Sequence, residues 1–388
     1  MNPKKYKAAL IIRTTGINDW SGVPYYVTKA FREYYGSQGL VINATKYFHI
    51  PGYVFNKTIA KLFKYGYRLA GKPLSYSFIG SWFYRWVMHF VLIVKAKKIN
   101  QSGFLFTFVP PYGINKKTIK VPIIGFSDAS FEHLIKWQQQ RELNYLERQV
   151  ENASLRAVKK CAVVVCMFPN VYTELINKGF RPDQLILFDK GFNLDRDEQN
   201  IDVVKKYNNK MILFIGRKHY KDGALKLIDA FFDARKIIPE LNLIIIGIAP
   251  GELGDALNNG IVIHQYLDKN IPDQLSLYKS YLQDASLYVN VAEIGGSYMA
   301  VIEAMVCHTP FILKECLELK LIFQKKKPSG VFLNEPITRS VLSDQIVLLL
   351  SDFRTWEQYS NNAHSMVSDF NWKHLFPKIE VFLNERNA

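Results

Sequence analysis

The sequence lacks the cysteine pattern of a disulfide-bonded or zinc-binding protein. Its 388 residues include four cysteines, and no CxxC pair or cysteine–histidine spacing of a metal site occurs among them. Two of them lie in the apolar run CAVVVCMF. Free cysteines in such runs behave as small hydrophobic side chains. We therefore expect buried thiols in a reducing compartment at Cys161, Cys166, Cys307 and Cys316.

Several signatures of other protein classes are also missing. The basic start MNPKKYKAALIIR has neither a long apolar core nor a small-residue cleavage site, so a signal peptide is not expected. No repeat of 20–50 residues and no low-complexity tract occurs. Zinc, RNA-recognition and helix-turn-helix signatures are absent, which argues against a nucleic-acid-binding protein. GIAPGELG lacks the GxGxxG spacing of a NAD-dependent dehydrogenase.

Acidic residues are scarce in the first half of the chain. Residues 1–195 hold 28 Lys and Arg against 11 Asp and Glu, whereas residues 196–388 hold 22 against 23. The net charge of +16 therefore comes from the first half. This asymmetry favours an anionic partner, either a membrane surface or nucleic acid, and a basic surface that only aids solubility is the alternative.

What the chain does contain is an alternation of short apolar runs and helical patterns, which occurs twice. A length of 388 residues favours two domains. Strands are expected at 7–13, 104–109, 120–126 and 162–166, and helices at 23–35 and 142–158. After a polar segment at 193–210, interpreted as a linker, strands are expected at 211–216, 243–247, 287–291 and 311–313, and helices near 223–236, 273–282, 298–306 and 337–350. The pattern predicts an α/β protein with two Rossmann-like domains that face each other across a cleft.

Two segments of the second half predict a pocket for a phosphate-linked sugar. AEIGGSYMAVIEAMVC, residues 292–307, is a Gly-rich turn that opens onto an apolar helix, whose N–H groups suit an anion. KMILFIGRKHYKDGALKLIDAF, residues 210–231, is a strand followed by Arg217 and Lys221. These cations and amides, with Glu293 and Glu303, suit a nucleotide diphosphate and sugar hydroxyls.

The first half has an apolar and basic region. FIGSWFYRWVMHFVLIVKAKK, residues 78–98, raises the question of a membrane span, but Arg85 and His89 interrupt it, so we interpret it as a covering helix. Basic residues recur at helical spacing among aromatics just before it, at Lys57, Lys61, Lys64 and Arg68. This pattern fits an amphipathic element on anionic lipid, and a solvated helix face with a few core aromatics is the alternative.

These segments resemble the family-four retaining glycosyltransferases of the GT-B fold. FIGRKHYKDGALKLIDAF is similar to the strand–GR–KG–helix–AF signature of that family, and EIGGSYMAVIEAMVCHTPFIL to its Glu–Gly-rich–EAMxCGxP signature. SGVPYYVTKAF, residues 21–31, resembles the first Gly-rich loop and helix of the acceptor half. Weaker similarities occur at 124–134, 158–180 and 187–195. The resemblance covers most of the chain and is strongest from residue 207 to 315.

The resemblance also implies the domain limits. Residues 1–195 would form the acceptor-binding domain, and residues 196–371 the nucleotide-sugar-binding domain. The segment 369–383, DFNWKHLFPKIEVFL, is similar to the C-terminal segment that crosses back to the first domain. A helix at about 372–388 would therefore complete the acceptor-binding domain.

On the donor side, the resemblance implies that Arg217 and Lys221 stabilise the leaving diphosphate in place of a metal, and that Gly216, just before Arg217, also contacts the donor. Glu303 would accept hydrogen bonds from the ribose hydroxyls, and Glu293 would hold the hydroxyls of the transferred sugar. Backbone N–H groups would be presented to the sugar and phosphate oxygens by Gly295, Gly296, Ser297 and Tyr298.

On the acceptor side, Gly22 would let its loop approach the phosphate. Asp128, at the end of the strand KVPIIGF, would orient acceptor or donor hydroxyls, with a capping role as the alternative.

The chain departs from the family pattern at five positions. Glu293 and Glu303 are ten positions apart instead of eight, and position 295 is glycine. The family lysine five positions after the arginine is Asp222 here, with Lys221 one position earlier. The other three departures are Ser127 for histidine, Phe168 for serine or threonine, and His308 for glycine.

The resemblance implies a retaining, metal-independent sugar transfer, in agreement with the lack of a DxD motif. The expected donor is a nucleotide-diphosphate sugar, and the acceptor a saccharide or lipid-linked hydroxyl in the synthesis of surface polysaccharide or glycoconjugate. No separate cofactor is expected. The expected location is the cytoplasm, on the inner face of the membrane. The alternatives are a sugar-nucleotide epimerase, a non-catalytic GT-B scaffold, a phosphorylase and a basic nucleic-acid-binding protein.

Overall fold

The structure is a computed structural model that describes residues 5–13, 16–17, 19–78, 81–108, 110–112, 117–195, 201–254, 260–293, 298–323 and 328–387. The chain divides into two compact units. Unit 1 comprises Met1–Gly191 and Asn371–Ala388, and unit 2 comprises Phe192–Phe370. Each unit is an α/β structure built on one six-stranded parallel sheet.

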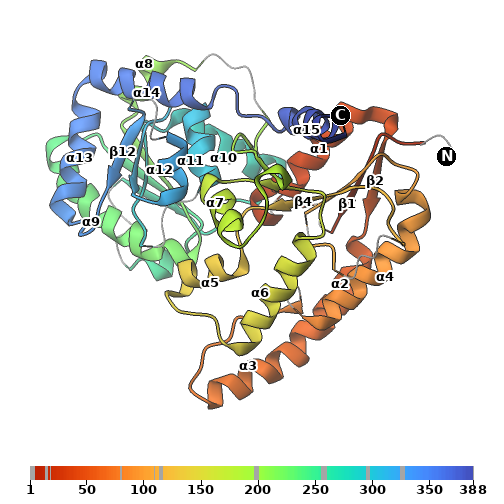
Figure 1. The fold of residues 1–388 in the computed structure, drawn as a ribbon. Helices are drawn as coiled ribbons and strands as arrows, with labels where there is room; N and C mark the ends of the chain where they lie inside the picture. Colours follow the sequence, from red (N-terminus) through yellow and green to blue (C-terminus); the bar gives the residue numbers. More distant parts are fainter. Residues whose placement is uncertain are drawn as a thin grey trace. The chain divides into compact units, whose positions relative to one another are not determined.

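The sheet of unit 1 has the strand order β2-β1-β3-β4-β5-β6 (Figure 1). Its strands are β1 (Ala8–Ile12), β2 (Gly39–Asn43), β3 (Leu105–Thr107), β4 (Ile123–Ser127), β5 (Val163–Cys166) and β6 (Leu185–Leu187). Its helices are α1 (Val23–Tyr35), α2 (Thr45–Lys57), α3 (Ile59–Leu69), α4 (Trp82–Ile99), α5 (Phe131–Gln139), α6 (Tyr145–Val158), α7 (Pro169–Asn177) and α15 (Leu375–Asn387).

The sheet of unit 2 has the strand order β12-β11-β10-β7-β8-β9. Its strands are β7 (Met211–Ile215), β8 (Asn242–Ile246), β9 (Ile261–His264), β10 (Leu287–Asn290), β11 (Phe311–Lys314) and β12 (Gly330–Leu333). Its helices are α8 (Val203–Asn208), α9 (Lys221–Ile237), α10 (Pro272–Asp284), α11 (Tyr298–Val306), α12 (Leu317–Phe323), α13 (Arg339–Ser351) and α14 (Phe353–Val367).

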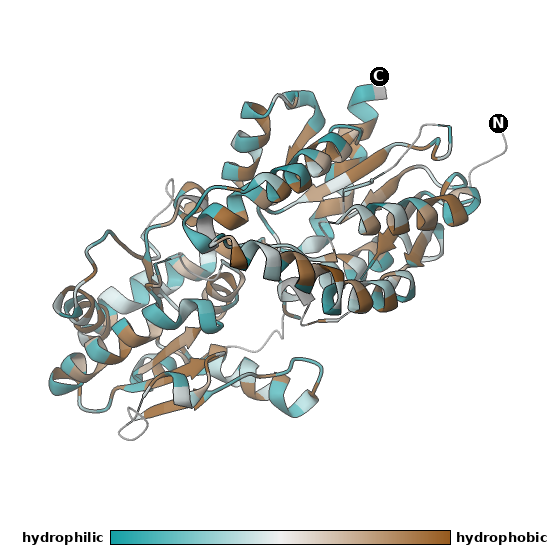
Figure 2. Ribbon diagram, turned by 90° about the horizontal axis from the view of Figure 1, so that it is seen from below, coloured by the Kyte–Doolittle hydropathy of each residue, from teal (hydrophilic) through white to brown (hydrophobic). Residues whose placement is uncertain are grey.

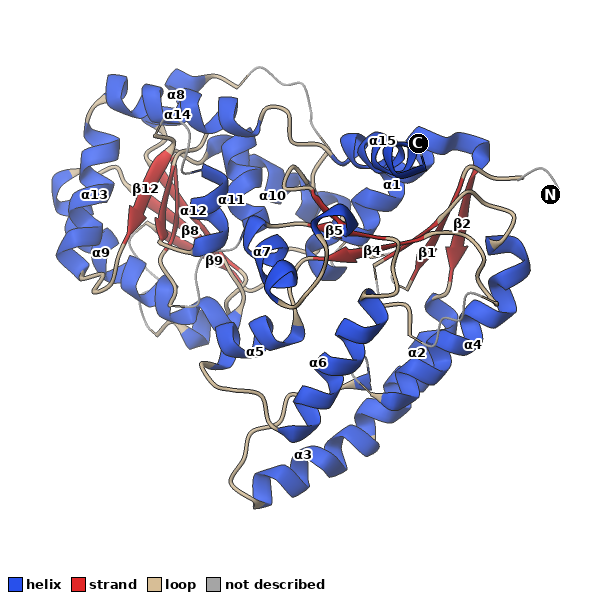
Figure 3. Cartoon of the chain, viewed as in Figure 1, coloured by secondary structure: helices blue, strands red, loops and turns tan. Residues whose placement is uncertain are grey.

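The central strands are apolar because both faces of each sheet are covered. All residues of β1 and β5 are buried, and the strands are largely brown in Figure 2. Helices lie on both sides of each sheet in Figure 3. The α/β fold class and the strands expected at 7–13, 162–166, 211–216 and 287–291 are confirmed.

Aromatic packing attaches the C-terminal helix to unit 1. The ring of Phe376 lies 5.2 Å from that of Phe31 and 5.6 Å from that of Phe106, and Trp372 stacks on Phe188. Lys378 Nζ donates a hydrogen bond of 2.7 Å to the carbonyl of Leu187, at the end of β6. The last helix is therefore part of the core of this unit.

Part of the segment that we interpreted as a linker is a helix. Asp202 caps α8 by accepting hydrogen bonds from the N–H groups of Val204 and Lys205. The side chain of Lys206 is buried, and its ammonium donates to the carbonyls of Leu282 and Gln283 at 2.9 and 2.8 Å. The polar composition was misleading because this lysine satisfies the carbonyl groups at the end of α10.

The thiols differ in their exposure. Cys161 and Cys166 are buried, as expected, and burial raises the pKa of each to about 12. Cys307 and Cys316 are only half-buried, so the expectation of four buried thiols is wrong for these two. All four are free.

Candidate functional site

The strand order of unit 2 reverses between two neighbouring strands, β7 and β10. From β7 the chain continues to β8 and β9 on one side, and then returns to β10 on the other side of β7. In open parallel sheets, ligands bind outside the carboxyl ends of the strands at such a switch point. The side chains of Asn290 and Tyr288 tie the two strand ends together, because both donate to the carbonyl of Ile215 at 3.3 Å.

Arg217 follows β7 at this point, and its side chain is exposed. Its guanidinium carbon lies 5.8 Å from the ring centre of Tyr266, beyond β9. Burial, and next the charge of Arg217, lower the pKa of His219. Lys221, half-buried, is the first residue of α9. Arg217, which we expect to bind the diphosphate, is therefore accessible at the switch point.

Gly216 has a structural reason to be glycine. A side chain at this position would place its Cβ 2.9 Å from that of Tyr220 and 3.0 Å from the ring of Phe214. In addition, Gly247, at φ +108°, packs its backbone directly against the carbonyl of Gly216. Gly216 therefore packs closely against its own chain, and its contact with the donor stays a prediction.

Hydrogen bonds fix the backbone at Glu293 from two sides. Its N–H donates to the carboxylate of Asp222 at 2.6 Å, and its carbonyl accepts from Lys314 Nζ at 2.8 Å. The side chain of Glu293 is 67% exposed and lies 3.9 Å from Lys226. Asp222, which replaces the lysine of the family pattern, therefore attaches α9 to the segment that follows β10.

Two lysines that the sequence analysis did not select lie beside Glu293. Lys226 and Lys314 both lie 3.3 Å from a carboxylate oxygen of Glu335. The hydrogen bond from the N–H of Ile337 lowers the pKa of Glu335 the most, and the two lysines lower it further. Burial acts in the opposite direction but does not outweigh them. A sequence signal for Lys314 was its place at the end of a buried strand, FILK. The carboxylates of Glu293 and Glu335 balance the charges of the two lysines, so this cluster links α9, the end of β11 and the segment around Glu335.

Glu303 is buried within unit 2. Its side chain is 2% exposed and accepts hydrogen bonds from Lys269 Nζ at 3.2 and 3.4 Å and from the hydroxyl of Tyr278. Burial, followed by the charge of Glu303, raises the pKa of Tyr278 well above its ordinary value, so this hydroxyl remains a donor. Lys269 and Tyr278 therefore already donate to the carboxylate to which the resemblance assigns the ribose hydroxyls.

The turn that carries three of the predicted residues, Gly295, Gly296 and Ser297, lies outside the described residues. Tyr298, which follows it, is the first residue of α11 and is half-buried.

Gly223 is a further residue that the sequence analysis missed. A Cβ at this position would lie 2.5 Å from the backbone nitrogen of Ala292 and 2.7 Å from its Cα. The glycine therefore lets the first turn of α9 contact the segment after β10. The signal in the sequence was a glycine within a helix start, where glycine costs about 1 kcal/mol relative to alanine.

We expect Gly223→Ala to lower the free energy of unfolding by about 1–3 kcal/mol, because the methyl group would force α9 away from Ala292. Gly66→Ala in α3 is the control, since a Cβ there would meet nothing within 4 Å. That variant should be stabilised by up to about 1 kcal/mol. Urea unfolding of both variants measures the difference, and equal effects would contradict the contact.

Unit 1 contains the two predicted residues of the acceptor side. Gly22, at φ +87°, precedes α1, and a Cβ there would lie 2.9 Å from the carbonyl oxygen of Ile17. Asp128 is half-buried and follows β4, at the carboxyl end of the sheet. Gly22 is therefore required by its own loop, while the roles of both residues toward a ligand stay predictions.

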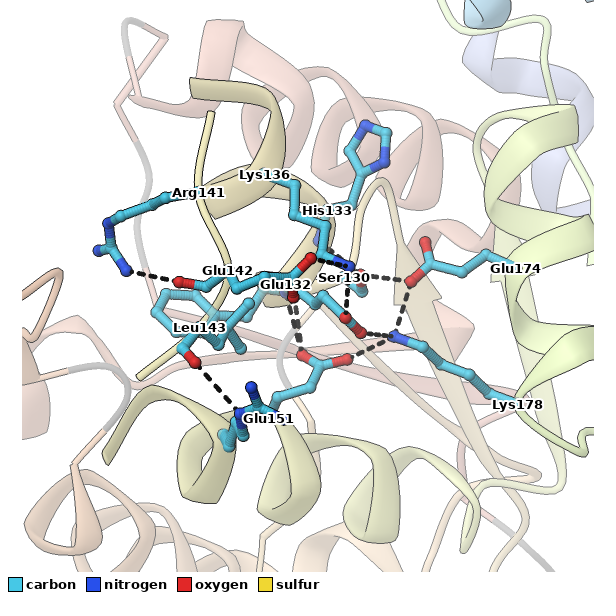
Figure 4. Close-up of polar contacts among 12 residues, drawn as sticks. Ser130, Glu132, His133, Lys136, Arg141, Glu142, Leu143, Glu151, Glu174 and Lys178 are labelled. Carbon is cyan, nitrogen blue, oxygen red and sulfur yellow. Dashed lines mark hydrogen bonds and ion pairs between the residues drawn. The ribbon is translucent and has the colours of Figure 1, made fainter. Parts of the chain in front are cut away.

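Three carboxylates surround one ammonium group elsewhere in unit 1 (Figure 4). Glu132, Glu151 and Glu174 offer oxygens within 4.8 Å of one another, a spacing that a metal ion could use. Lys178 Nζ, however, lies 3.2, 2.7 and 2.7 Å from these carboxylates, in that order. Burial disfavours the charge of Lys178, but the hydrogen bonds to Glu151 and Glu174 outweigh it and raise its pKa. We interpret the cluster as an ionic link between α5, α6 and the end of α7.

Residues 195–366 match the model of the family described as glycosyl transferases group 1. No curated protein sequence matches the chain. In the part of the chain that the structure describes, none of the helices combines the length and apolar character needed to cross a bilayer.

The fold is similar to several solved structures. A mutant of Staphylococcus aureus TarM in complex with fondaparinux, alpha-GlcNAc-glycerol and UDP is 14% identical over 77% of this chain, with a TM-score of 0.57. The chain spans only 58% of the length of TarM. Anabaena HepE in complex with UDP is 13% identical over 98% of this chain and 100% of HepE, with a TM-score of 0.65.

A protein described as a putative UDP-N-acetylglucosamine 2-epimerase of Listeria monocytogenes has the same fold. It is 12% identical over 98% of this chain and 97% of its own, with a TM-score of 0.61. Fold alone therefore does not separate transfer from epimerisation. The resemblance of the motifs to the glycosyltransferases is nevertheless confirmed: residues 195–366 match glycosyl transferases group 1, and the two parallel sheets are those of the GT-B fold.

Proposed function

We propose that this chain is a retaining glycosyltransferase that moves a sugar from a nucleotide-diphosphate sugar to an acceptor hydroxyl. The observation that carries the proposal is the family match over residues 195–366, which includes Arg217 and Glu293 at the switch point of the unit 2 sheet. The solved relatives contribute the fold and no more.

The chemistry requires stabilisation of the diphosphate as its bond to the anomeric carbon lengthens. Arg217 would donate charge-assisted hydrogen bonds to the phosphate oxygens, with Lys221 beside it. Under this proposal, cationic side chains replace a divalent metal ion.

Retention of configuration would follow from attack on the face that the diphosphate leaves. The acceptor oxygen would bond to the anomeric carbon as the carbon–phosphate oxygen bond breaks, and a phosphate oxygen would take the proton of the acceptor. Glu293 and Asp128 would then position hydroxyl groups, and correct orientation would supply a large part of the rate gain.

We further propose that the acceptor is a saccharide or a lipid-linked hydroxyl in surface polysaccharide or glycoconjugate synthesis. The basic character of the first half supports an acceptor that is met at an anionic membrane surface, on the cytoplasmic side. Transfer of labelled sugar to a lipid extract and to free oligosaccharides would distinguish the two acceptor types.

The test begins with the donor. Thermal unfolding is measured with UDP-, GDP-, ADP- and TDP-sugars, because a ligand that binds only the folded state raises the melting temperature. The stabilising donor is then supplied with acceptors in the presence of EDTA, and proton NMR reads the anomeric configuration of the product. Inversion, a requirement for metal, or stabilisation by none of the donors would contradict the corresponding part of the proposal.

Epimerisation of the sugar nucleotide is the second candidate, since the Listeria protein shares the fold. An epimerase would act on the sugar nucleotide with no acceptor present. Turnover of donor without acceptor, with a changed sugar configuration, would favour it over transfer.

A further inference from the structure

Unit 1 contains a long stretch without an acidic residue. Between Glu33 and Asp128, the 94 residues 34–127 include 13 Lys and Arg and no Asp or Glu. Helices α2, α3 and α4 all lie within this stretch. Cations that have no carboxylate neighbours in the sequence produce a strong positive potential, which attracts anionic surfaces.

Helix α3 leaves its apolar side chains uncovered. Among its eleven residues only Ala60 is buried. Leu62 and Leu69 are 72% and 71% exposed, and Ile59 and Phe63 are also exposed. At 100° per residue, these four side chains share one face of the helix, and Lys61, Lys64 and Arg68 lie on the opposite face. A short helix with these two faces is typical of a segment that lies in a membrane interface.

Helix α4 adds a row of exposed aromatic rings. Trp82, Trp86 and Phe90 are four residues apart, and the rings of Trp86 and Phe90 stack at 6.2 Å. Val87 and Val91, on another face of the helix, are buried in the core. The interpretation of this segment as a covering helix is therefore confirmed, and the outer face of the helix carries the exposed rings. Tryptophan is enriched at membrane–water interfaces because one part of its ring system is apolar and the other donates a hydrogen bond.

Helix α2 connects these two elements. Ring contacts pack it against α4, with Tyr47 at 6.5 Å from Phe90 and Phe55 at 6.2 Å from Phe83. Thr58 separates α2 from α3, so the basic segment expected as one amphipathic element is two helices. Figure 1 shows α3 continuing from α2, with α4 beside α2, and Figure 2 shows the same side of unit 1 from below. We call the exposed side chains of these helices the α2–α4 face; its apolar members on α3 and α4 are Ile59, Leu62, Phe63, Leu69, Trp82, Trp86 and Phe90.

We propose that the α2–α4 face docks on an anionic phospholipid bilayer. This inference rests on the proposed function and deepens it by naming the surface at which the acceptor is met. Leu62 and Leu69 of α3 and Trp86 of α4 enter the headgroup region, while lysines such as Lys61 remain near the lipid phosphates with their apolar stems along the interface.

The chemistry of the face favours lipid over the other candidate occupants. A second copy of this chain would bring two acid-free, basic stretches together, and like charges across an interface are unfavourable. Nucleic acid would use the lysines but not the exposed leucines and tryptophans, since its interfaces are more polar than those between proteins. An anionic bilayer is complementary to the charge and to the apolar groups.

The test uses the full chain and vesicles of phosphatidylcholine, with and without phosphatidylglycerol. We expect co-sedimentation with the anionic vesicles, weakened by high salt. Leu62→Asp and Trp86→Ala should each weaken binding roughly tenfold or more, because each removes a large apolar group from the interface. Lys61→Gln and Lys64→Gln should each weaken it about fivefold.

Leu348→Asp is the matched control, because Leu348 is 58% exposed on α13 in unit 2 and should leave vesicle binding unchanged. Quenching of tryptophan fluorescence by brominated lipid tests depth. The fraction of the fluorescence that brominated lipid quenches should decrease in the Trp82→Phe and Trp86→Phe double variant.

Four outcomes would overturn the docking proposal. They are equal binding to uncharged vesicles, binding insensitive to Leu62→Asp, binding to DNA without binding to vesicles, and a dimer that Leu62→Asp dissociates. Thermal stabilisation by donor sugars separates this proposal from the proposed function, because it reports on unit 2. If the protein binds donor sugars but not anionic vesicles, only the docking proposal is refuted. If it binds anionic vesicles but no donor sugar, only the proposed transferase function is refuted.

Discussion

Arg217→Ala is expected to lower the rate of sugar transfer by roughly 10²–10³ at saturating donor, because it removes a preorganised donor to the leaving diphosphate. The guanidinium is exposed at the end of β7. Surface substitutions of this kind usually change stability by less than about 0.5 kcal/mol. The measurement is turnover with the donor that the thermal-shift panel selects, together with the melting temperature of each variant.

Lys218→Ala is the matched control for Arg217. This neighbouring side chain is also cationic and exposed, and it forms a 3.0 Å ion pair with Glu252. Its removal lowers the net charge equally, so a specific role of Arg217 predicts a large effect at 217 and a small one at 218. Equal losses in both variants would indicate a general effect of positive potential. Full turnover of Arg217→Ala would refute the assignment.

Glu303→Ala is expected to destabilise unit 2 by about 3 kcal/mol, in addition to weakening donor binding. The substitution leaves Lys269 and Tyr278 in the protein without their carboxylate partner, and breaking a buried ion pair typically costs about 3–5 kcal/mol. We expect the lower end because the side chain of Lys269 is 16% exposed. Urea unfolding measures the loss.

Removing both partners separates the ion pair from the carboxylate itself. Glu303→Ala combined with Lys269→Met should be less destabilised than Glu303→Ala alone, because the ammonium that faces the missing carboxylate is removed with it. A double variant that is destabilised by the full sum of the single effects would contradict the pairing.

Glu303→Gln tests the ribose role without creating a cavity. An amide has one acceptor oxygen, whereas a carboxylate can accept from both ribose hydroxyls. If Glu303 binds ribose, donor affinity should fall roughly tenfold to a hundredfold, since hydrogen bonds to charged groups contribute about 1.5–3 kcal/mol. Isothermal titration with the selected donor measures the change. Unchanged affinity would assign Glu303 to the fold alone.

The pattern of apolar runs was sufficient to predict most of the central strands and their helices. Helix α1, for example, was expected at 23–35 and occupies Val23–Tyr35. Strands β2, β6, β9 and β12, which are the edge strands of the two sheets, were not predicted, and β2, β9 and β12 are only partly buried. Edge strands carry a weaker hydrophobic signal since they are covered less completely.

The candidate site shows the same division between local and non-local information. The positions of Arg217 after a strand and of Tyr298 at a helix start follow from local pattern, and the structure has both. The bond from the N–H of Glu293 to Asp222 and the pairing of Lys269 with Glu303 were not predictable. Each joins segments more than 30 residues apart.

The sequence by itself determined two α/β units, a basic first half and a motif-bearing second half, because periodicity and charge are properties of neighbouring residues. Only the tertiary structure decided that Gly223 fits against Ala292, that Lys226 and Lys314 meet at Glu335, and that the apolar face of α3 is left uncovered. The physical reason is that packing and ion pairing depend on which strand ends and helix faces the topology brings together. A single local pattern fits many such arrangements.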